Sequence, residues 1–289
     1  MPDFVDEFAR NMGRMRALIA SSLEASISVG DRHGWQPEAG STAACEREDA
    51  PAGNGVALAV EVGWNLMGAQ ALEGIETIAH LLSQPAPPTY SLYPIARMAI
   101  ETLARAWWLF EPDLGASDRA ARGLGEFIAA FRKNLERPDL DARETIDRLG
   151  RVQTMAQDFG LAIKLGNDGL ISKVGDVHRE KTGALLESFY EDADLGIWVH
   201  AVMSEASHGN VVALFRGLDD VPDDEGMYRA VREGDLRLIV ASVLIAWWQC
   251  DVRRVELLGW RDEEWVRAGQ AVHAELTAMI QPMAVPLDD

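Results

Sequence analysis

Cysteine is scarce in this 289-residue chain, which contains only Cys45 and Cys250. Two cysteines cannot build a disulfide framework or a four-ligand structural zinc site, so both are excluded. The sequence also lacks any run of 18 apolar residues. The nearest approach is LRLIVASVLIAWWQC, which is shorter than the ~20 residues of a membrane-spanning helix and contains Arg237. We expect this segment to be a buried core helix.

Positive charge is also in short supply, and lysine is rare. The chain has 27 basic against 46 acidic residues, a net charge of −19, and only four lysines. A surface that follows nucleic-acid phosphates needs clustered basic residues, so nucleic acid is not an expected partner. The N-terminus is acidic from Asp3 onward and lacks the basic and apolar segments of a signal peptide. These features predict a cytoplasmic protein without a membrane partner.

Strand-like alternation, repeats and strand–helix–strand patterns are lacking, whereas helical periodicity is nearly continuous. With 48% hydrophobic residues the chain can bury a sizeable core. We predict an all-α fold, a single-domain bundle of about eight helices over residues 1–289. A long loop rich in Gly, Ala, Pro and acidic residues is expected at about 29–55, and an acidic turn at 218–226. The predicted helices cover 3–28, 56–83, 91–111, 116–136, 139–163, 177–190, 194–216, 227–258 and 262–281.

The predicted helix SLYPIARMAIETLARAWWLF carries a narrow polar strip. Arg97, Glu101 and Arg105 fall within ~80° of one another on a helical wheel, and Trp108 shares their strip. A narrow polar strip is typical of a central helix. One interpretation is a buried Arg–Glu–Arg ladder, which must be paired to be tolerated and could bind a ligand or take part in catalysis. The other is a solvent-facing ridge of two i,i+4 ion pairs. Tyr90 could close over the start of this helix.

A second polar cluster lies in HAVMSEASHGNVVALF, where His200, Ser204 and His208 follow at four-residue spacing. The two histidines would stand ~12 Å apart along one straight helix, so they cannot bind the same ion. Gly209 follows directly. It could end the helix and leave His208 beside free carbonyls, an environment that favours the imidazolium, or it could allow close helix packing.

Carboxylates at helical spacing suggest a metal hypothesis. Glu205 and His208 form a Glu-x-x-His pair, which is half of the motif of di-iron helical bundles. Glu76 and His80, one turn apart, are also capable of binding a metal. Together with Glu101 they make a conceivable set of ligands for a divalent metal cofactor. The alternative is that the histidines are ordinary hydrogen-bonded residues of a helical core.

The segments YPIARMAIETLARAWWLFEP and MSEASHGNVVALFRG resemble a group of uncharacterised all-helical bacterial proteins, some of which are related to the HEPN superfamily. Their shared pattern is Arg-x-x-x-Glu on one helix and Ser-x-x-x-His on another. The resemblance covers roughly residues 90–217. It implies that Arg97, Glu101, Ser204 and His208 converge in space.

HEPN ribonucleases share an Arg-x(4–6)-His motif, and Arg267 with His273 resembles it in spacing. About one such match is expected by chance in this sequence, and the two side chains would point ~120° apart on a straight helix. The alternative is an ordinary amphipathic helix near the C-terminus.

These patterns leave three functional hypotheses. The first is a helical protein whose Arg/Glu/Ser/His cluster binds a small molecule or a protein partner. The second is a HEPN-like ribonuclease or toxin-type enzyme, and the third is a metal-dependent, di-iron-type enzyme. The pairs Trp107–Trp108 and Trp247–Trp248 are expected in the core, with homodimer contacts as the alternative. The candidate catalytic residues are Arg97, Glu101, Ser204 and His208; the candidate binding residues are Tyr90, Arg105 and Trp108; the candidate metal ligands are Glu76, His80, Glu205 and His208.

Overall fold

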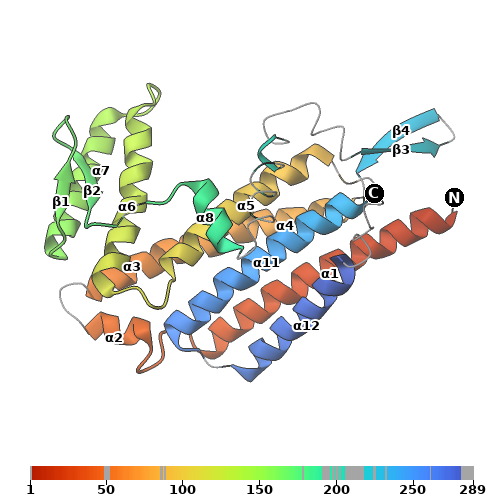
Figure 1. Ribbon diagram of the computed structural model, residues 1–289, viewed down its shortest axis with the longest axis horizontal. Coiled ribbons are helices and arrows are strands. Elements are labelled where there is room, and N and C mark those ends of the chain that lie inside the picture. Colours follow the sequence, from red (N-terminus) through yellow and green to blue (C-terminus); the bar gives the residue numbers. More distant parts are fainter. Residues whose placement is uncertain are drawn as a thin grey trace, which may run out of the picture.

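The computed structural model describes residues 2–48, 53–84, 87, 89–177, 179–190, 196, 199, 201, 203–205, 218–223, 226–231, 233–260 and 262–280. Helices dominate these residues, so the predicted all-α fold is confirmed (Figure 1).

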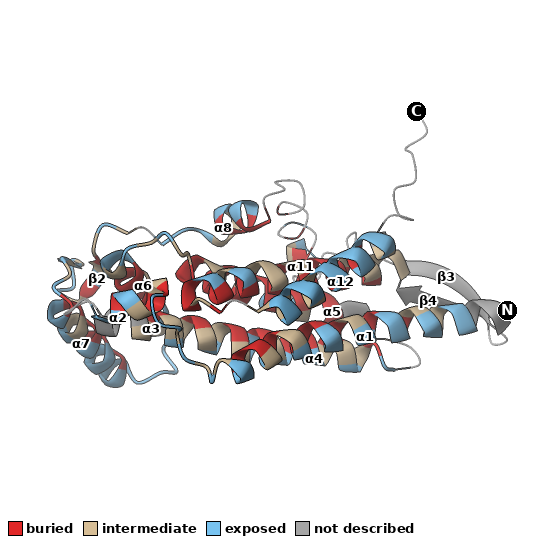
Figure 2. Ribbon diagram, turned by 90° about the horizontal axis from the view of Figure 1, so that it is seen from below, coloured by how far each residue is buried: buried red, intermediate tan, exposed pale blue. Residues whose placement is uncertain are grey.

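The main body is an elongated bundle of long helices that lie side by side (Figure 1). Its helix α5 is buried along most of its length by α11 on one side and α4 on another (Figure 2). The segment expected as a core helix lies in α11, where Leu236, Val240 and Leu244 are buried. The bundle comprises α1 (Pro2–Arg32), α4 (Leu72–Leu81), α5 (Thr89–Leu109), α11 (Glu233–Leu258) and α12 (Glu263–Ile280).

One end of the bundle carries a smaller lobe with its own apolar cluster. The lobe packs a two-stranded antiparallel sheet against two helices: α6 (Ala116–Leu135), α7 (Ala142–Asp158), β1 (Ile163–Leu165) and β2 (Ile171–Val174). Helix α3 (Gly53–Trp64) crosses α6 closely, because a Cβ at Gly123 would lie only 3.2 Å from the Cα of Ala59. A π-helical turn, η1 (Asn65–Ala71), joins α3 to α4 without a break.

The loop expected at 29–55 is shorter than predicted. Helix α1 continues to Arg32, and α2 (Thr42–Glu48) forms inside the expected loop. Tertiary contacts account for the difference, because Glu46 of α2 is buried in an ion pair with Arg119 of α6. A composition rich in Gly, Ala and acidic residues does not reveal such a contact.

Two hairpins replace predicted helical or turn segments. The helix predicted to reach 163 ends at Asp158, and Gly160 takes up a left-handed φ of 68° before β1 begins. Gly169, with φ 76°, allows the tight connection between β1 and β2. The expected turn at 218–226 and the first residues of the helix predicted at 227–258 form a second antiparallel hairpin, β3 (Leu218–Asp223) with β4 (Gly226–Val231). Pairing of the two strands stabilises a backbone conformation that neither segment indicates alone.

Helix α8 (Thr182–Phe189) begins later than the predicted 177, and its N-cap residue Lys181 has an extended backbone. The predicted helix 194–216 lies mainly outside the described residues. Positions 196, 199, 201 and 203–205 are described and are helical.

Candidate functional site

Three of the four residues expected to converge do meet. Arg97 and Glu101 lie one turn apart on α5, and the Nε of Arg97 donates to Oε1 of Glu101 at 2.7 Å. The Nη1 of Arg97 donates to Oγ of Ser204, 107 residues further along the chain, at 3.1 Å. The Arg97 and Glu101 side chains are 23% and 30% exposed, so the pair sits at a half-buried boundary. His208, His200 and Gly209 lie outside the described residues.

Arg105 does not extend this pair into the expected ladder. It turns instead toward the start of α8, where its Nη2 donates to Oγ1 of Thr182 at 3.3 Å. Its Nη1 stands 3.7 Å from Oε1 of Glu126 on α6. Neither the ladder nor the solvent ridge of two ion pairs is therefore correct. Arg105 lies one turn beyond Glu101 on α5. At this point α5 is next to α6 and α8, and Arg105 interacts with their residues.

Arg105 is the most deeply buried cation of this cluster. Its side chain is only 9% exposed, and its Nη1 finds no hydrogen-bond acceptor in the described part of the chain. Desolvation lowers the pKa of Arg105 below the ordinary value, while the Glu126 carboxylate opposes that change. The guanidinium nevertheless stays charged. Glu126 itself accepts two hydrogen bonds from Arg179, at 2.9 and 3.0 Å.

These side chains line an open groove of about 470 Å³, here named the α5–α8 groove. Three arginines and two glutamates face it, together with Thr102, Thr182 and a small apolar portion. Leu66 in the groove belongs to the π-helical turn η1, a type of turn that often occurs at functional sites. The groove is lined by Leu66, Pro94, Arg97, Met98, Glu101, Thr102, Arg105, Glu126, Arg179 and Thr182.

The other two candidate binding residues do not join this groove in the described structure. Trp108 is buried, and the guanidinium of Arg122 lies over its ring at 4.5 Å from the centroid. It lines a different groove, between α6 and β2, because three further turns of α5 bring it opposite the lobe. Among the described residues, Trp108 and Arg97 therefore line different grooves, and a binding role for Trp108 stays a prediction. The side chain of Tyr90 is not among those described.

The candidate metal ligands are dispersed in the described structure. Glu76 and His80 are exposed on α4, and Glu205 is exposed beside Ser204. Among the residues that the structure describes, no three His, Cys, Asp or Glu side chains form a group that could hold a metal ion. His208, the remaining candidate ligand, falls outside that set, and the metal hypothesis stays a prediction.

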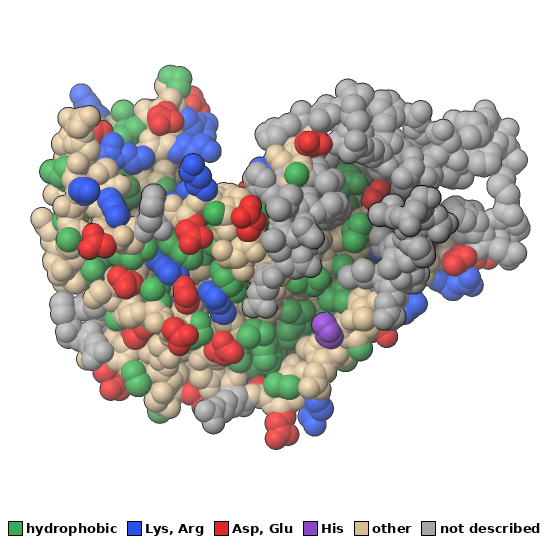
Figure 3. Space-filling model, in the orientation of Figure 1, with side chains coloured by type: hydrophobic (Ala, Val, Ile, Leu, Met, Phe, Trp, Pro, Cys, Tyr) green, Lys and Arg blue, Asp and Glu red, His purple; other side chains and the backbone are tan. Residues whose placement is uncertain are grey.

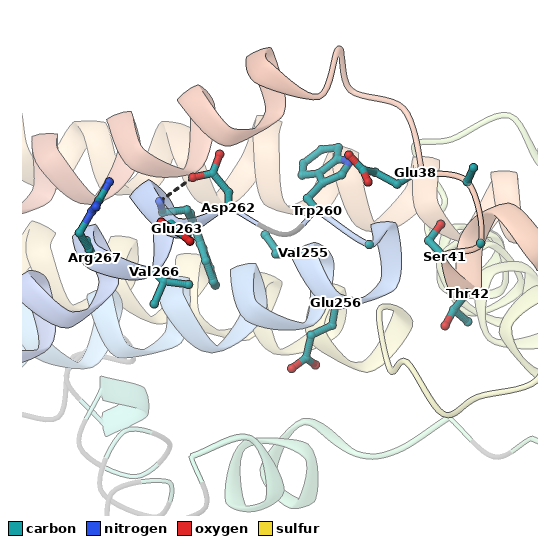
Figure 4. Close-up of a pocket in the computed structure, with 14 residues that line it drawn as sticks. Glu38, Ser41, Thr42, Val255, Glu256, Trp260, Asp262, Glu263, Val266 and Arg267 are labelled. Atoms are coloured by element: carbon teal, nitrogen blue, oxygen red, sulfur yellow. Dashed lines mark hydrogen bonds between the residues drawn. The ribbon is translucent and has the colours of Figure 1, made fainter.

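Arg267 and His273 are both exposed on α12, the predicted amphipathic helix. Arg267 lies at one end of a groove of about 1030 Å³, with Ser41 and Thr42 at the other end (Figure 4). Asp262, in this groove, accepts a hydrogen bond from the backbone N–H of Trp265 at 2.8 Å. Burial opposes ionisation of Asp262, but hydrogen bonds from Arg32 and from Trp265 hold its pKa below the ordinary value.

A polar cluster that the sequence did not reveal lies inside the bundle. Asp251 and Arg254 of α11 are 0% and 1% exposed and form an ion pair with N···O distance 2.6 Å. Asp251 also accepts hydrogen bonds from Oγ of Ser26 at 2.7 Å and from Nε1 of Trp265 at 2.8 Å. Arg254 in turn donates to the carbonyl of Ser26 at 3.0 Å. This cluster ties α1, α11 and α12 together.

Three tryptophan rings surround the Arg254 guanidinium. Its Cζ lies 5.7, 5.3 and 4.9 Å from the ring centroids of Trp35, Trp64 and Trp260. Rings at these distances attract the cation through their negative faces. Neither Asp251 nor Arg254 is among the described residues with a buried polar atom that lacks a hydrogen-bond partner. The cluster is therefore structural.

No helix in the described part of the chain is both long and apolar enough to span a membrane. Comparisons with family models, with curated proteins and with solved structures found no match to this chain.

Proposed function

We propose that this protein is a helical binding protein whose α5–α8 groove holds a small organic anion, a carboxylate or a phosphate ester. The observation that carries the proposal is the state of Arg105. Its side chain is nine-tenths buried, yet its Nη1 has no hydrogen-bond acceptor among the described residues. Leaving a charged buried donor unsatisfied costs about 1–3 kcal/mol or more. An anionic oxygen bound in the groove would remove that cost.

The surrounding charges support an anion rather than a cation. Arg97, Arg105 and Arg179 contribute three positive charges and Glu101 and Glu126 two negative ones, so the groove is cationic in a chain of net charge −19. The carboxylate of Glu126 accepts two hydrogen bonds from Arg179 and lies 3.7 Å from Arg105. Glu126 therefore does not satisfy Arg105 fully, and a ligand oxygen can approach its planar fork.

The other polar and apolar groups in the groove indicate which chemical groups the ligand carries besides its anionic group. The hydroxyl of Thr102 donates to the carbonyl of Met98 within α5, so its oxygen is left to accept. Glu101 accepts from Arg97 through Oε1, and its carboxylate can accept further from a hydroxyl or amine of the ligand. Leu66 and Met98 supply apolar contact. These contacts favour a ligand with one anionic group, one hydrogen-bond donor and a short apolar part.

The test is a thermal-shift screen of organic carboxylates and phosphate esters at constant ionic strength, followed by calorimetric titration of the compounds that stabilise the protein. A bound anion at 100 times its Kd would add about 2.7 kcal/mol to the free energy of unfolding. For a chain of this size that corresponds to a Tm rise of roughly 4–5 °C.

Arg105→Met is expected to abolish the stabilisation while retaining the fold, because Glu126 keeps its two hydrogen bonds from Arg179. Arg148→Met is the matched control, since Arg148 is an exposed arginine on α7 that forms an ion pair with Glu144 and lies 5.8 Å from the centroid of the Phe131 ring, away from the groove. Equal binding by the Arg105→Met protein, or the absence of any stabilising anion, would refute the proposed function.

A further inference from the structure

The charge of the chain is divided unevenly between the lobe and the rest of the molecule. Residues 116–181 hold 12 of the 27 basic residues, among them all four lysines, and 11 of the 46 acidic residues. This part therefore carries +1, whereas the remainder of the chain carries −20. Lys and Arg side chains gather visibly over the lobe (Figure 3). An anion approaching the molecule meets its least repulsive surface here.

A second groove, here named the α6–β2 groove, opens on this lobe with a volume of about 420 Å³. Four basic residues line it, namely Arg122, Arg132, Lys173 and Arg179, and no acidic residue does. The remaining lining is largely apolar and includes Ile128, Val174 and Val177. A volume in this range and a mainly apolar wall with a few charged groups are typical of small-molecule sites.

The four cations are not equally available to a ligand. Arg132 is held by both oxygens of Asp168 and by the carbonyls of Leu170 and Ile171, so its donors are used. Arg179 is likewise bound to Glu126 through two hydrogen bonds. These two arginines shape the rim but have little left to donate.

Arg122 and Lys173 do retain free donors. Arg122 lies over the Trp108 ring and binds Glu111 through Nη1, but its buried Nε has no acceptor among the described residues. Lys173 donates to the carbonyl of Asp176 at 3.1 Å and makes no ion pair with a carboxylate in the described structure. Arg122 and Lys173, each with a donor that no described residue accepts from, thus line one mainly apolar cavity.

We infer that the α6–β2 groove is a second ligand site, separate from the α5–α8 groove, that binds an aromatic carboxylate. Its carboxylate is held by Arg122 and Lys173, and its ring lies on the apolar wall beside Gly125. A Cβ placed at Gly125 would meet no atom within 4 Å, so the space above this residue is open to the ring. Arg179 lines both grooves, and its ion pair with Glu126 lies at their shared edge.

The experiment is calorimetric titration of the full chain with 2-naphthoate and with its neutral counterpart 2-naphthamide. The carboxylate is expected to bind saturably, and the amide at least ~10-fold more weakly, because the neutral amide cannot form ion pairs with Arg122 and Lys173. Lys173→Met is expected to weaken naphthoate binding by a similar factor of ~10. Lys133→Met, an exposed lysine of the same lobe, serves as its control and should bind as the wild type does.

Gly125→Leu tests the position of the ring. The leucine side chain would project into open space, so the fold is retained while the groove is filled, and naphthoate binding is expected to be lost. Gly150→Leu on α7 is the matched control, because a Cβ there also meets no atom within 4 Å. No binding of naphthoate, equal binding of the amide, or unchanged binding by the Gly125→Leu protein each overturns the inference.

Arg105→Met separates this inference from the proposed function. Naphthoate binding that survives Arg105→Met and is lost in Gly125→Leu supports the α6–β2 groove, whatever binds in the α5–α8 groove. The reverse pattern would assign naphthoate to the α5–α8 groove and overturn the inference made here.

Discussion

Replacing Asp251 by asparagine is expected to lower the free energy of unfolding by about 3–5 kcal/mol. Asp251 is fully buried, and it neutralises the equally buried Arg254 at 2.6 Å. Asparagine keeps the size of the side chain but removes its charge, so Arg254 is left as an uncompensated cation in the core. One carboxylate oxygen accepts from Ser26 and Trp265 and the other from Arg254, so the NH₂ group of asparagine faces a donor whichever way the amide is turned.

The magnitude follows from what each partner loses. Breaking a buried ion pair from one side costs about 3–5 kcal/mol, because the remaining charge cannot return to water. The three tryptophan rings around Arg254 offset part of this, at about 0.5–2 kcal/mol per cation–ring contact. The same rings surround Arg254 in the native protein, so they do not reduce the difference in unfolding free energy between the native protein and the Asp251→Asn variant.

A double-mutant cycle tests this reasoning more sharply than one substitution. Arg254→Met alone should also cost about 3–5 kcal/mol, since it leaves Asp251 charged and buried. The double variant should cost less than the two single costs together by at least ~2 kcal/mol, because its second substitution removes the charge that the first left unpaired. Urea unfolding followed by circular dichroism measures all four proteins.

The expected fall in Tm for either single variant is on the order of 10 °C for a chain of this size. Arg148→Met, which breaks the exposed pair with Glu144, should change the free energy of unfolding by less than ~0.5 kcal/mol. Single costs below ~1 kcal/mol, or strictly additive costs in the cycle, would show that the Asp251–Arg254 pair does not carry the assigned role.

Two further substitution and titration experiments probe the core. Gly30→Ala should destabilise the protein by about 1–3 kcal/mol in urea unfolding, because the new Cβ would lie 2.3 Å from the ring of Trp35; Gly13→Ala on the same helix, where a Cβ meets no atom within 4 Å, should not destabilise it. Burial raises the pKa of Tyr93 to about 12, so the ultraviolet absorbance of tyrosinate should show this residue ionising later than free tyrosine. Because its folded pKa exceeds the unfolded value of ~10, Tyr93 contributes stability that is complete below pH ~10 and is lost as the pH rises through about 12. The variant Tyr93→Phe should lose less stability over that interval, and an equal loss in both proteins would contradict the assignment.

Periodicity in the sequence was sufficient to predict the long helices of the bundle because long amphipathic segments repeat the same local signal, whereas the seven-residue α2 was missed. Helix α6 begins and ends within one residue of its predicted bounds. The two hairpins were missed for the opposite reason. Strands of three to six residues give little periodic signal, and only the turn residues around Gly169 could have indicated the first of them.

The candidate site shows the same division between local and tertiary information. The pair Arg97–Glu101 lies within one turn of helix and could be predicted from spacing alone. The partners of Arg105 come from α6 and from the residue that begins α8, and no local pattern identifies Glu126 or Thr182. The cluster of Asp251 and Arg254 depends on Ser26, 225 residues away from Asp251 in sequence, so only the packed structure reveals it.

The π-helical turn at Asn65–Ala71 lies between a helix that contacts the core of the lobe and a helix that belongs to the core of the bundle. It therefore limits the insertions and deletions that this segment can tolerate. Leu58 of α3 packs on the apolar cluster of the lobe, while Ile75 and Ile78 of α4 belong to that of the main bundle. A π turn accommodates one residue more than the α-helix, so deleting one residue would favour a regular helix. A further insertion or deletion, which the turn does not absorb, would rotate the apolar face of α4 by ~100° relative to α3, and one of the two cores would lose its contacts. Length changes that a surface loop would tolerate are therefore not neutral in this segment.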